Sequence, residues 1–391
     1  MRRRGWVAAA TVAVVALAPL APASAGGAHP AADSSVTSLC LPAAPAATPS
    51  PAIGLRFGVD PGLAGNPLPS LKGPVSVNHR AELKALHALQ PHHRALVIRL
   101  NRLFWSGGNN LLNTFVHEAK SYARRGFDVE VQVRYHPTKT EDGDLAAWSS
   151  WVHHVVNVLG QVRRLVALTI TNEVNLAISP NTSDGSYTSA QGALVHGVEA
   201  AYSALRKHGW AHRVKVGFTF AYRLDPLADS GLFSFLAKHG GARFLHALGF
   251  VGLDDYPGSV YPPTLVPPID TAADELASAL ATMRDCYLPL AGIGPKTPLW
   301  VTENGYASNG SVSNTSGDAT QVAALRGMVD TVETYSGTYD VTDYRWFNLR
   351  DNNSNGSGLF DKDGLLRDHD QRKPSFTAYR DLIKRDGQAI P

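Results

Sequence analysis

Two glutamates in this chain each follow a short apolar run. Glu173 lies near the end of LVALTITNEVN, residues 165–175, and Glu303 lies near the end of PLWVTENGY, residues 298–306. Both runs are too short for a helix and end in residues that favour loops, which is typical of buried strands. In parallel α/β folds, ligands gather at the carboxyl ends of the strands. Two carboxyl groups that meet there could divide acid–base work between them.

A single strand-end glutamate has an ordinary structural explanation, because it can cap the next helix or form a surface ion pair. A pair on separate strands suits a particular chemistry. Hydrolysis of a glycosidic bond needs one carboxyl group that protonates the leaving oxygen and a second that attacks or activates water. The hypothesis therefore requires a fold that brings Glu173 and Glu303 to the same end of one sheet.

The chain alternates between strand-like apolar runs and stretches in which apolar residues recur at helical spacing. This is the pattern of a parallel sheet with crossover helices. The strand-like runs are residues 53–60, 94–105, 128–137, 165–175, 213–222, 247–258, 298–306 and 341–351.

Eight βα units in one series predict a (β/α)8 TIM barrel over residues 53–391, with Glu173 on the fourth strand and Glu303 on the seventh. An open doubly wound sheet is the alternative, but the first run is not followed by a GxGxxG turn. Long segments after the strands would form the walls of a cleft. These segments are residues 178–189, 259–270, 307–318 and 352–364.

The first 25 residues contain a basic start, an apolar stretch and a small-residue site at Ala23 to Ala25. This pattern predicts a secretory signal peptide over residues 1–25, with a membrane anchor as the alternative, and hence a secreted protein. Residues 26–52 are rich in Ala and Pro and predict a tail or linker. No later segment is long and apolar enough to cross a bilayer, so we expect no membrane contact after cleavage.

The formal net charge is +3 and the predicted leader carries three arginines, which leaves 3 − 3 = 0 for the mature chain apart from its termini. A chain without a basic excess is not expected to bind nucleic acid. The two cysteines, Cys40 and Cys286, are too few for a cysteine metal cluster. In an exported protein we predict that they form one disulfide, with buried free thiols as the alternative.

The motifs TNEVN, around Glu173, and VTENG, around Glu303, resemble the signature pair of the clan of retaining (β/α)8 glycoside hydrolases that includes families 1, 2, 5, 39 and 51. TENG resembles the nucleophile motif of family 1, and NEVN resembles the NEPN of family 39, with Val174 in place of the proline. The resemblance implies that Glu173 is the acid/base, that Glu303 is the nucleophile, and that Asn172 binds the sugar hydroxyl beside the reacting carbon.

Other strand ends resemble the same clan. Arg99 resembles the strand-two arginine of family 5, and Tyr256, in DDYPG, resembles the tyrosine that hydrogen-bonds the nucleophile. Trp346, in YRWFN, resembles the tryptophan that forms the floor of the sugar subsite. Core positions are the alternatives for Tyr256 and Trp346. His136, in RYHP, could either bind a sugar hydroxyl or serve a structural role.

The sequence contains no EF-hand loop, HExxH motif or phosphate loop, and we expect no metal and no cofactor. The leading hypothesis is a secreted, monomeric retaining glycosidase whose substrate is an oligo- or polysaccharide of an extracellular or cell-wall glycan. One alternative is a transglycosylase on the same scaffold. Others are a non-catalytic carbohydrate-binding barrel and a metal-dependent barrel hydrolase.

Overall fold

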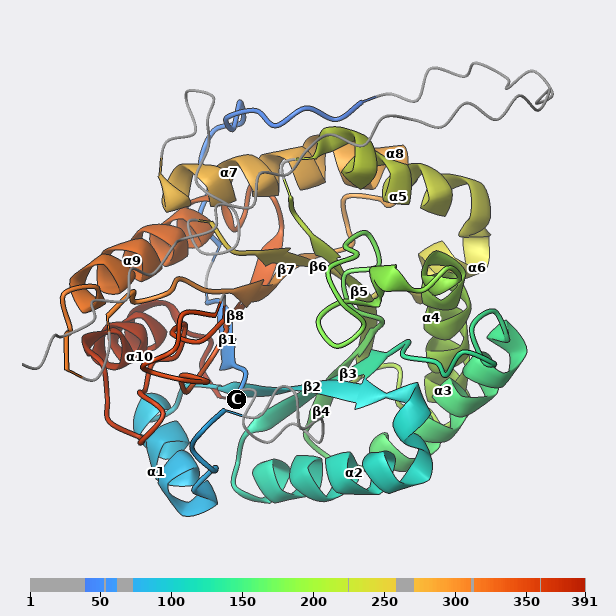
Figure 1. Cartoon of the computed structure of the whole chain (residues 1–391). Coiled ribbons are helices and arrows are strands. Elements are labelled where there is room, and N and C mark those ends of the chain that lie inside the picture. Colours follow the sequence, from blue (N-terminus) through green and yellow to red (C-terminus); the bar gives the residue numbers. More distant parts are fainter. Residues whose placement is uncertain are drawn as a thin grey trace, which may run out of the picture. The chain divides into compact units, whose positions relative to one another are not determined.

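Eight parallel strands close into a barrel in sequence order, with β1 paired to both β2 and β8 (Figure 1). The computed structural model describes residues 39–52, 54–61, 73–223, 225–257, 271–310, 313–358 and 360–390. The strands in these residues are β1 (Arg56–Val59), β2 (Val97–Phe104), β3 (Asp128–Arg134), β4 (Leu165–Ile170), β5 (Lys215–Ala221), β6 (Phe250–Asp255), β7 (Leu299–Asn304) and β8 (Val341–Trp346). The closed barrel confirms the (β/α)8 prediction and excludes the open sheet.

Helices surround the barrel and connect successive strands (Figure 1). They are α1 (His79–Leu89), α2 (Gly108–Arg124), α3 (Leu145–Leu159), α4 (Ala190–Lys207), α5 (Pro226–His239), α6 (Gly241–Ala247), α7 (Ala272–Thr282), α8 (Leu288–Leu290), α9 (Asp318–Tyr335) and α10 (Pro374–Asp386). The described residues also contain short helical turns, which are η3 (Trp105–Gly107), η4 (Asp184–Ser186) and η5 (Met283–Tyr287). The predicted leader, residues 1–25, and the predicted loop 259–270 lie outside the described residues.

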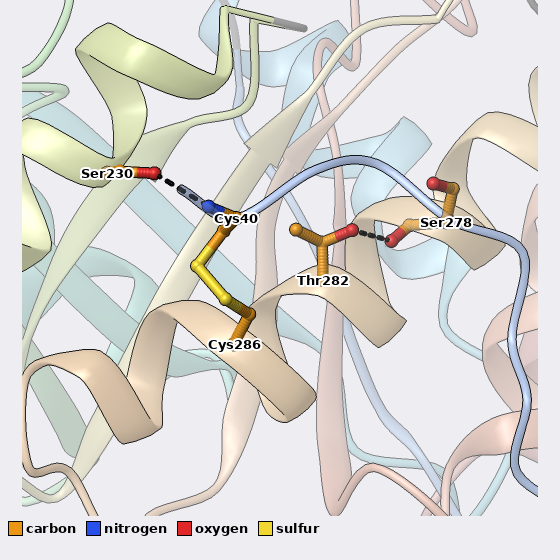
Figure 2. Close-up of a disulfide and its surroundings, with 5 residues drawn as sticks. All are labelled: Cys40, Ser230, Ser278, Thr282 and Cys286. Carbon is orange, nitrogen blue, oxygen red and sulfur yellow. Dashed lines mark hydrogen bonds between the residues drawn. A yellow bond between two sulfur atoms is a disulfide. The ribbon is translucent and has the colours of Figure 1, made fainter. Parts of the chain in front are cut away.

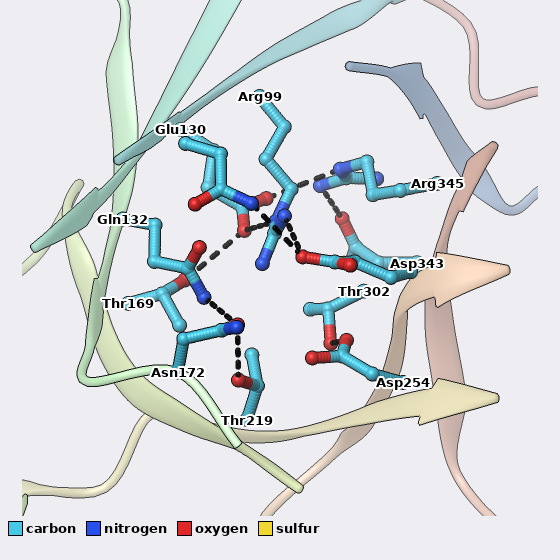
Figure 3. Close-up of polar contacts among 12 residues, drawn as sticks. Arg99, Glu130, Gln132, Thr169, Asn172, Thr219, Asp254, Thr302, Asp343 and Arg345 are labelled. Atoms are coloured by element: carbon cyan, nitrogen blue, oxygen red, sulfur yellow. Dashed lines mark hydrogen bonds and ion pairs between the residues drawn. The ribbon is translucent and has the colours of Figure 1, made fainter. Parts of the chain in front are cut away.

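Alternation along β3 shows how the sequence builds the two sides of the barrel wall. Val129, Val131 and Val133 belong to the apolar core between barrel and helices. Glu130 and Gln132, on the opposite face, point into the barrel (Figure 3). This period of two places hydrophobic residues toward the helices and polar residues in the interior.

The barrel interior holds a buried ion-pair network instead of a purely apolar layer (Figure 3). Glu130 accepts a hydrogen bond from Nε of Arg99 at 3.2 Å and another from Nε of Arg345 at 3.1 Å. Arg345 also donates to Asp343 at 2.7 Å. Because buried charges require such partners, the network fixes the side chain of Arg99 at the centre of the barrel.

A disulfide joins Cys40 to Cys286, with 5.7 Å between the Cα atoms, and confirms the predicted bond (Figure 2). The backbone N–H of Cys40 donates to Ser230, and that of Ala52 donates to Ser336. Residues 39–52 are therefore held against η5 by the disulfide and against α5 and the end of α9 by hydrogen bonds. Among the described residues, no helix is long and apolar enough to traverse a bilayer.

Candidate active site

Glu303, the fifth residue of β7, receives hydrogen bonds on both carboxyl oxygens. Nη1 of Arg99 donates to Oε1 at 2.5 Å, and Nδ2 of Asn101 donates to the same oxygen at 3.2 Å. The hydroxyl of Tyr256 donates to Oε2 at 2.6 Å. Donors from β2 and from the residue after β6 therefore hold the carboxyl group in one orientation.

Glu173 follows β4 in an uncommon backbone conformation, with φ of 46°. Its backbone N–H donates to the hydroxyl of Thr219 at 3.2 Å, and its Oε2 accepts from Nδ2 of Asn172 at 3.1 Å. Burial raises its pKa well above the usual range, and the negative charges of Asp254 and Glu303 raise it further. These effects favour the protonated form of Glu173 over its ionised form.

Both glutamates line one small cavity of about 50 Å³ at the carboxyl end of the barrel. Both residues are buried, with exposed fractions of 6% for Glu173 and 5% for Glu303. The structure thus brings together the two glutamates that were predicted from separate strands. The other residues of the wall are Asn101, Arg102, Leu176, Ile178, Asn181, Thr182, Ala221, Asp254, Tyr256, Phe347 and Phe360.

Asn172 is buried beside Glu173 and is not part of the cavity wall. Its amide oxygen accepts from Gln132 and, at 3.2 Å, from Thr219 (Figure 3). Its amide nitrogen donates to Glu173 and to the carbonyl of Thr182. The amide is therefore fully engaged within the protein. In this position it orients the carboxyl group of Glu173.

Asp254, in β6, is a wall residue that sequence reasoning did not single out. Thr302 donates to its Oδ1 at 2.7 Å (Figure 3). Burial raises its pKa well above the usual range, as does the charge of Glu303. The pair of aspartates before Tyr256 in DDYPG was the only sequence signal, and it does not reveal which of the two faces the cavity.

Of the predicted binding residues, Tyr256 lines the cavity, and Arg99 and Asn172 lie behind its wall in contact with Glu303 and Glu173. The other two, Trp346 and His136, are not among the residues that line it. Trp346 is fully buried, and its indole N–H donates to the carbonyl of Asp363 at 2.9 Å. The aromatic residue directly after β8 that lines the cavity is Phe347. His136 packs on Phe104, with ring centroids 4.4 Å apart, and burial followed by the charge of Arg134 lowers its pKa.

In the described part of the chain, no cluster of three or more His, Cys, Asp and Glu residues could hold a metal ion. The wall that contains Glu173 and Glu303 instead has the composition of an acid–base site.

No known family model matches the sequence, and no curated protein matches it either. Solved structures do match the fold. A β-glucosidase from Thermotoga maritima has a TM-score of 0.60 and 14% identity, covering 86% of this chain and 98% of that chain. A GH5_18 protein from Bifidobacterium longum subsp. infantis has a TM-score of 0.59 and 13% identity, covering 86% and 80%.

A fungal β-1,4-galactanase is also similar, with a TM-score of 0.56 and 12% identity over 84% of this chain and 99% of that chain. At these identities the likeness establishes a shared barrel fold. The matched solved structures include enzymes named as a β-glucosidase and a β-1,4-galactanase, but a shared fold does not determine the chemistry, which depends on the side chains of each chain.

Proposed function

We propose that this protein is a secreted retaining glycoside hydrolase that uses Glu303 as nucleophile and Glu173 as acid/base. The observation that carries the proposal is the contrast between two carboxyl groups in one cavity. Glu303 accepts hydrogen bonds from Arg99, Asn101 and Tyr256, whereas burial and neighbouring carboxylates raise the pKa of Glu173. A glycosidase needs one carboxyl group that attacks and another that holds a proton for the leaving group, and the two environments fit these two roles.

In the first step, an oxygen of Glu303 attacks the anomeric carbon while Glu173 donates its proton to the leaving oxygen. The glycosidic bond breaks, and a covalent ester joins the sugar to Glu303. In the second step, Glu173 removes a proton from water, and the resulting hydroxide attacks the anomeric carbon and releases Glu303. Two displacements at one carbon return its original configuration.

Retention, rather than inversion, is supported by the closeness of the two carboxyl groups. They share one small cavity, and the charge of Glu303 contributes to the raised pKa of Glu173, an effect that weakens with distance. Retaining enzymes hold the two groups roughly 5 to 5.5 Å apart, whereas inverting enzymes leave a wider gap for an attacking water.

Secretion is supported by the leader-like residues 1–25 and by the disulfide between Cys40 and Cys286. Disulfides of this kind persist in oxidising compartments outside the cytosol. An extracellular or cell-wall glycan is therefore the substrate class that we propose.

The deciding experiment is a screen of aryl glycosides, followed by NMR of the first product anomer on any substrate that is turned over. We expect retained configuration in the wild-type protein. Glu303→Ala should abolish turnover of every substrate, whereas Glu173→Ala should keep activity on leaving groups that need no proton and should gain rate with added azide. An inverted first product would refute both assigned roles.

A further inference from the structure

Arg102 occupies an irregular position in β2, where the strand contains an extra residue. Leu100 pairs with Val131 and Leu103 pairs with Val133, so three steps on β2 match two steps on β3. Arg102 has φ of 75°, a left-handed conformation that bulky residues rarely adopt. Such a bulge redirects a side chain, and bulges of this kind are frequent beside active sites.

The bulge places Arg102 on the wall of two cavities. One is the small cavity that contains Glu173 and Glu303. The other is a neighbouring cavity of about 720 Å³ between β2 and the helices α1 and α2, and Asn101 and Arg102 line both. The side chain of Arg102 therefore lies at the junction between the reacting carboxyl groups and a space large enough for sugar units.

Arg102 is 8% exposed, and its Nε has no hydrogen-bond partner. Across the described residues, no side chain forms an ion pair with it, whereas Arg99, Arg134 and Arg345 each contact a carboxylate within 3.2 Å. Burial lowers the pKa of Arg102 to about 10, so the guanidinium is still charged at neutral pH. The charges of Asp60 and Glu303 favour the charged form, whereas that of Arg134 opposes it. A buried cation whose Nε lacks a hydrogen bond is costly, and a bound anion would lower this cost.

We propose that Arg102 binds an anionic group on the substrate, either the carboxylate of a uronic acid or a sulfate ester, in the sugar that spans the two cavities. The inference rests on the proposed glycosidase function. A guanidinium presents donors in a planar fork that matches two oxygens of such a group. It would also offset the repulsion between an anionic sugar and the carboxylate of Glu303.

The test compares matched aryl glycosides in which position 6 carries a hydroxyl, a carboxylate or a sulfate. We expect the wild-type protein to prefer one anionic form by at least about 10-fold in kcat/KM. Arg102→Gln should lower the ratio of anionic to neutral turnover by about 10- to 100-fold, since it removes hydrogen bonds to a charged group. Arg102→Lys should restore part of this ratio. The carboxylate and sulfate substrates identify which oxyanion is bound.

Arg124→Gln is the control, because Arg124 is an exposed residue of α2 outside both cavities and its loss changes the net charge equally. This variant should leave the ratio unchanged. Thermal unfolding of each variant shows whether the substitution changes the stability of the fold as well as the substrate ratio. If Arg102→Gln lowers only the melting temperature and the substrate ratio does not move, Arg102 serves the fold and the inference is wrong.

Binding is measured independently of turnover, by calorimetry with free glucuronate, glucose 6-sulfate and glucose. Selective binding of an anionic sugar that is lost in Arg102→Gln supports the inference, even if no glycoside is hydrolysed. Absence of hydrolysis in that case would overturn the glycosidase proposal and leave the inference standing. Hydrolysis of neutral glycosides without any preference for anionic sugars would overturn the inference alone. Absence of both anionic binding and anionic turnover overturns it as well.

Discussion

The hydroxyl of Tyr256 donates a hydrogen bond to Oε2 of Glu303 at 2.6 Å, while Arg99 occupies the other oxygen. Burial raises the pKa of Tyr256 well above its usual range, so the phenol keeps its proton. The bond fixes the rotation of the Glu303 carboxyl group, which in the proposed reaction attacks the anomeric carbon. Its loss should therefore affect the reaction more than the fold.

Tyr256→Phe is expected to lower kcat/KM by about 10- to 100-fold, because one hydrogen bond to a charged group contributes roughly 1.5 to 3 kcal/mol. The ring remains to pack against Phe347 and Phe360, so the melting temperature should change little. Steady-state kinetics and thermal unfolding measure the two effects. An unchanged kcat/KM would mean that the hydroxyl has no part in holding the nucleophile.

The adjacent residues Trp346 and Phe347 should respond in opposite ways to truncation. Trp346 is fully buried in the core, and Trp346→Ala should destabilise the fold by about 3 to 5 kcal/mol. Phe347 lines the cavity, and Phe347→Ala should lower kcat/KM with a smaller loss of stability. Urea unfolding and kinetics on both variants provide the comparison. A stable but inactive Trp346→Ala protein would instead support the original interpretation, in which Trp346 forms the floor of the sugar subsite.

Asp255 and Glu275 form a buried pair of carboxyl groups on β6 and α7, outside the cavity wall. Burial raises the pKa of Asp255 to about 8, and burial together with Asp255 raises the pKa of Glu275 to about 9. In the unfolded chain both ionise near pH 4. Between these limits the folded protein binds more protons, so stability should fall as pH rises, by up to about 1.4 kcal/mol per pH unit for each group.

Asp255→Asn should therefore lose less stability than the wild type between pH 6 and pH 9, as read from thermal unfolding at each pH. Asp381→Asn changes an exposed aspartate of α10 and serves as the control. Parallel stability curves for the wild type and Asp255→Asn would show that the carboxyl group is already ionised in the folded protein.

The order of elements was predictable because each strand carries a strong local signal. A continuous apolar run, closed by loop residues, is typical of a strand buried in a parallel sheet. Once the barrel closes, its geometry brings the ends of all strands to one face, and this is why Glu173, Arg99, Tyr256 and Glu303 meet. The strand count predicted that these segments meet, whereas the direction of each side chain also depends on register.

Features that depend on a shift of one residue were not predictable. Successive side chains of a strand point to opposite faces, so Trp346 lies in the core whereas the next residue, Phe347, lines the cavity. The bulge at Arg102 likewise follows from pairing with β3 and has no local sequence signal. The raised pKa of Asp254 could not be predicted from the sequence, because it depends on burial and on neighbouring charges that only the folded structure shows.

The alkaline limit of activity should be set by the coupled carboxyl groups of Glu173 and Asp254. As acid, Glu173 works only while protonated, so kcat/KM should fall as pH rises through its raised pKa. Burial is the largest cause of that raised pKa, followed by the charge of Asp254 and then that of Glu303. Asp254→Asn removes a carboxyl group whose negative charge raises the pKa of Glu173, and it keeps an acceptor for the hydroxyl of Thr302. Glu173 should then ionise more easily, and the alkaline limb should move to lower pH.

The assignment of the alkaline limb to Glu173 is tested with Glu173→Gln on an aryl glycoside whose leaving group needs no proton. This variant should lose the alkaline limb, because the titrating acid is gone, while Asp381→Asn should reproduce the wild-type profile. Rates are measured across the pH range in which each protein is shown to stay folded. A limb that persists in Glu173→Gln and does not move in Asp254→Asn would belong to a different group, and Glu173 would then not be the proton donor.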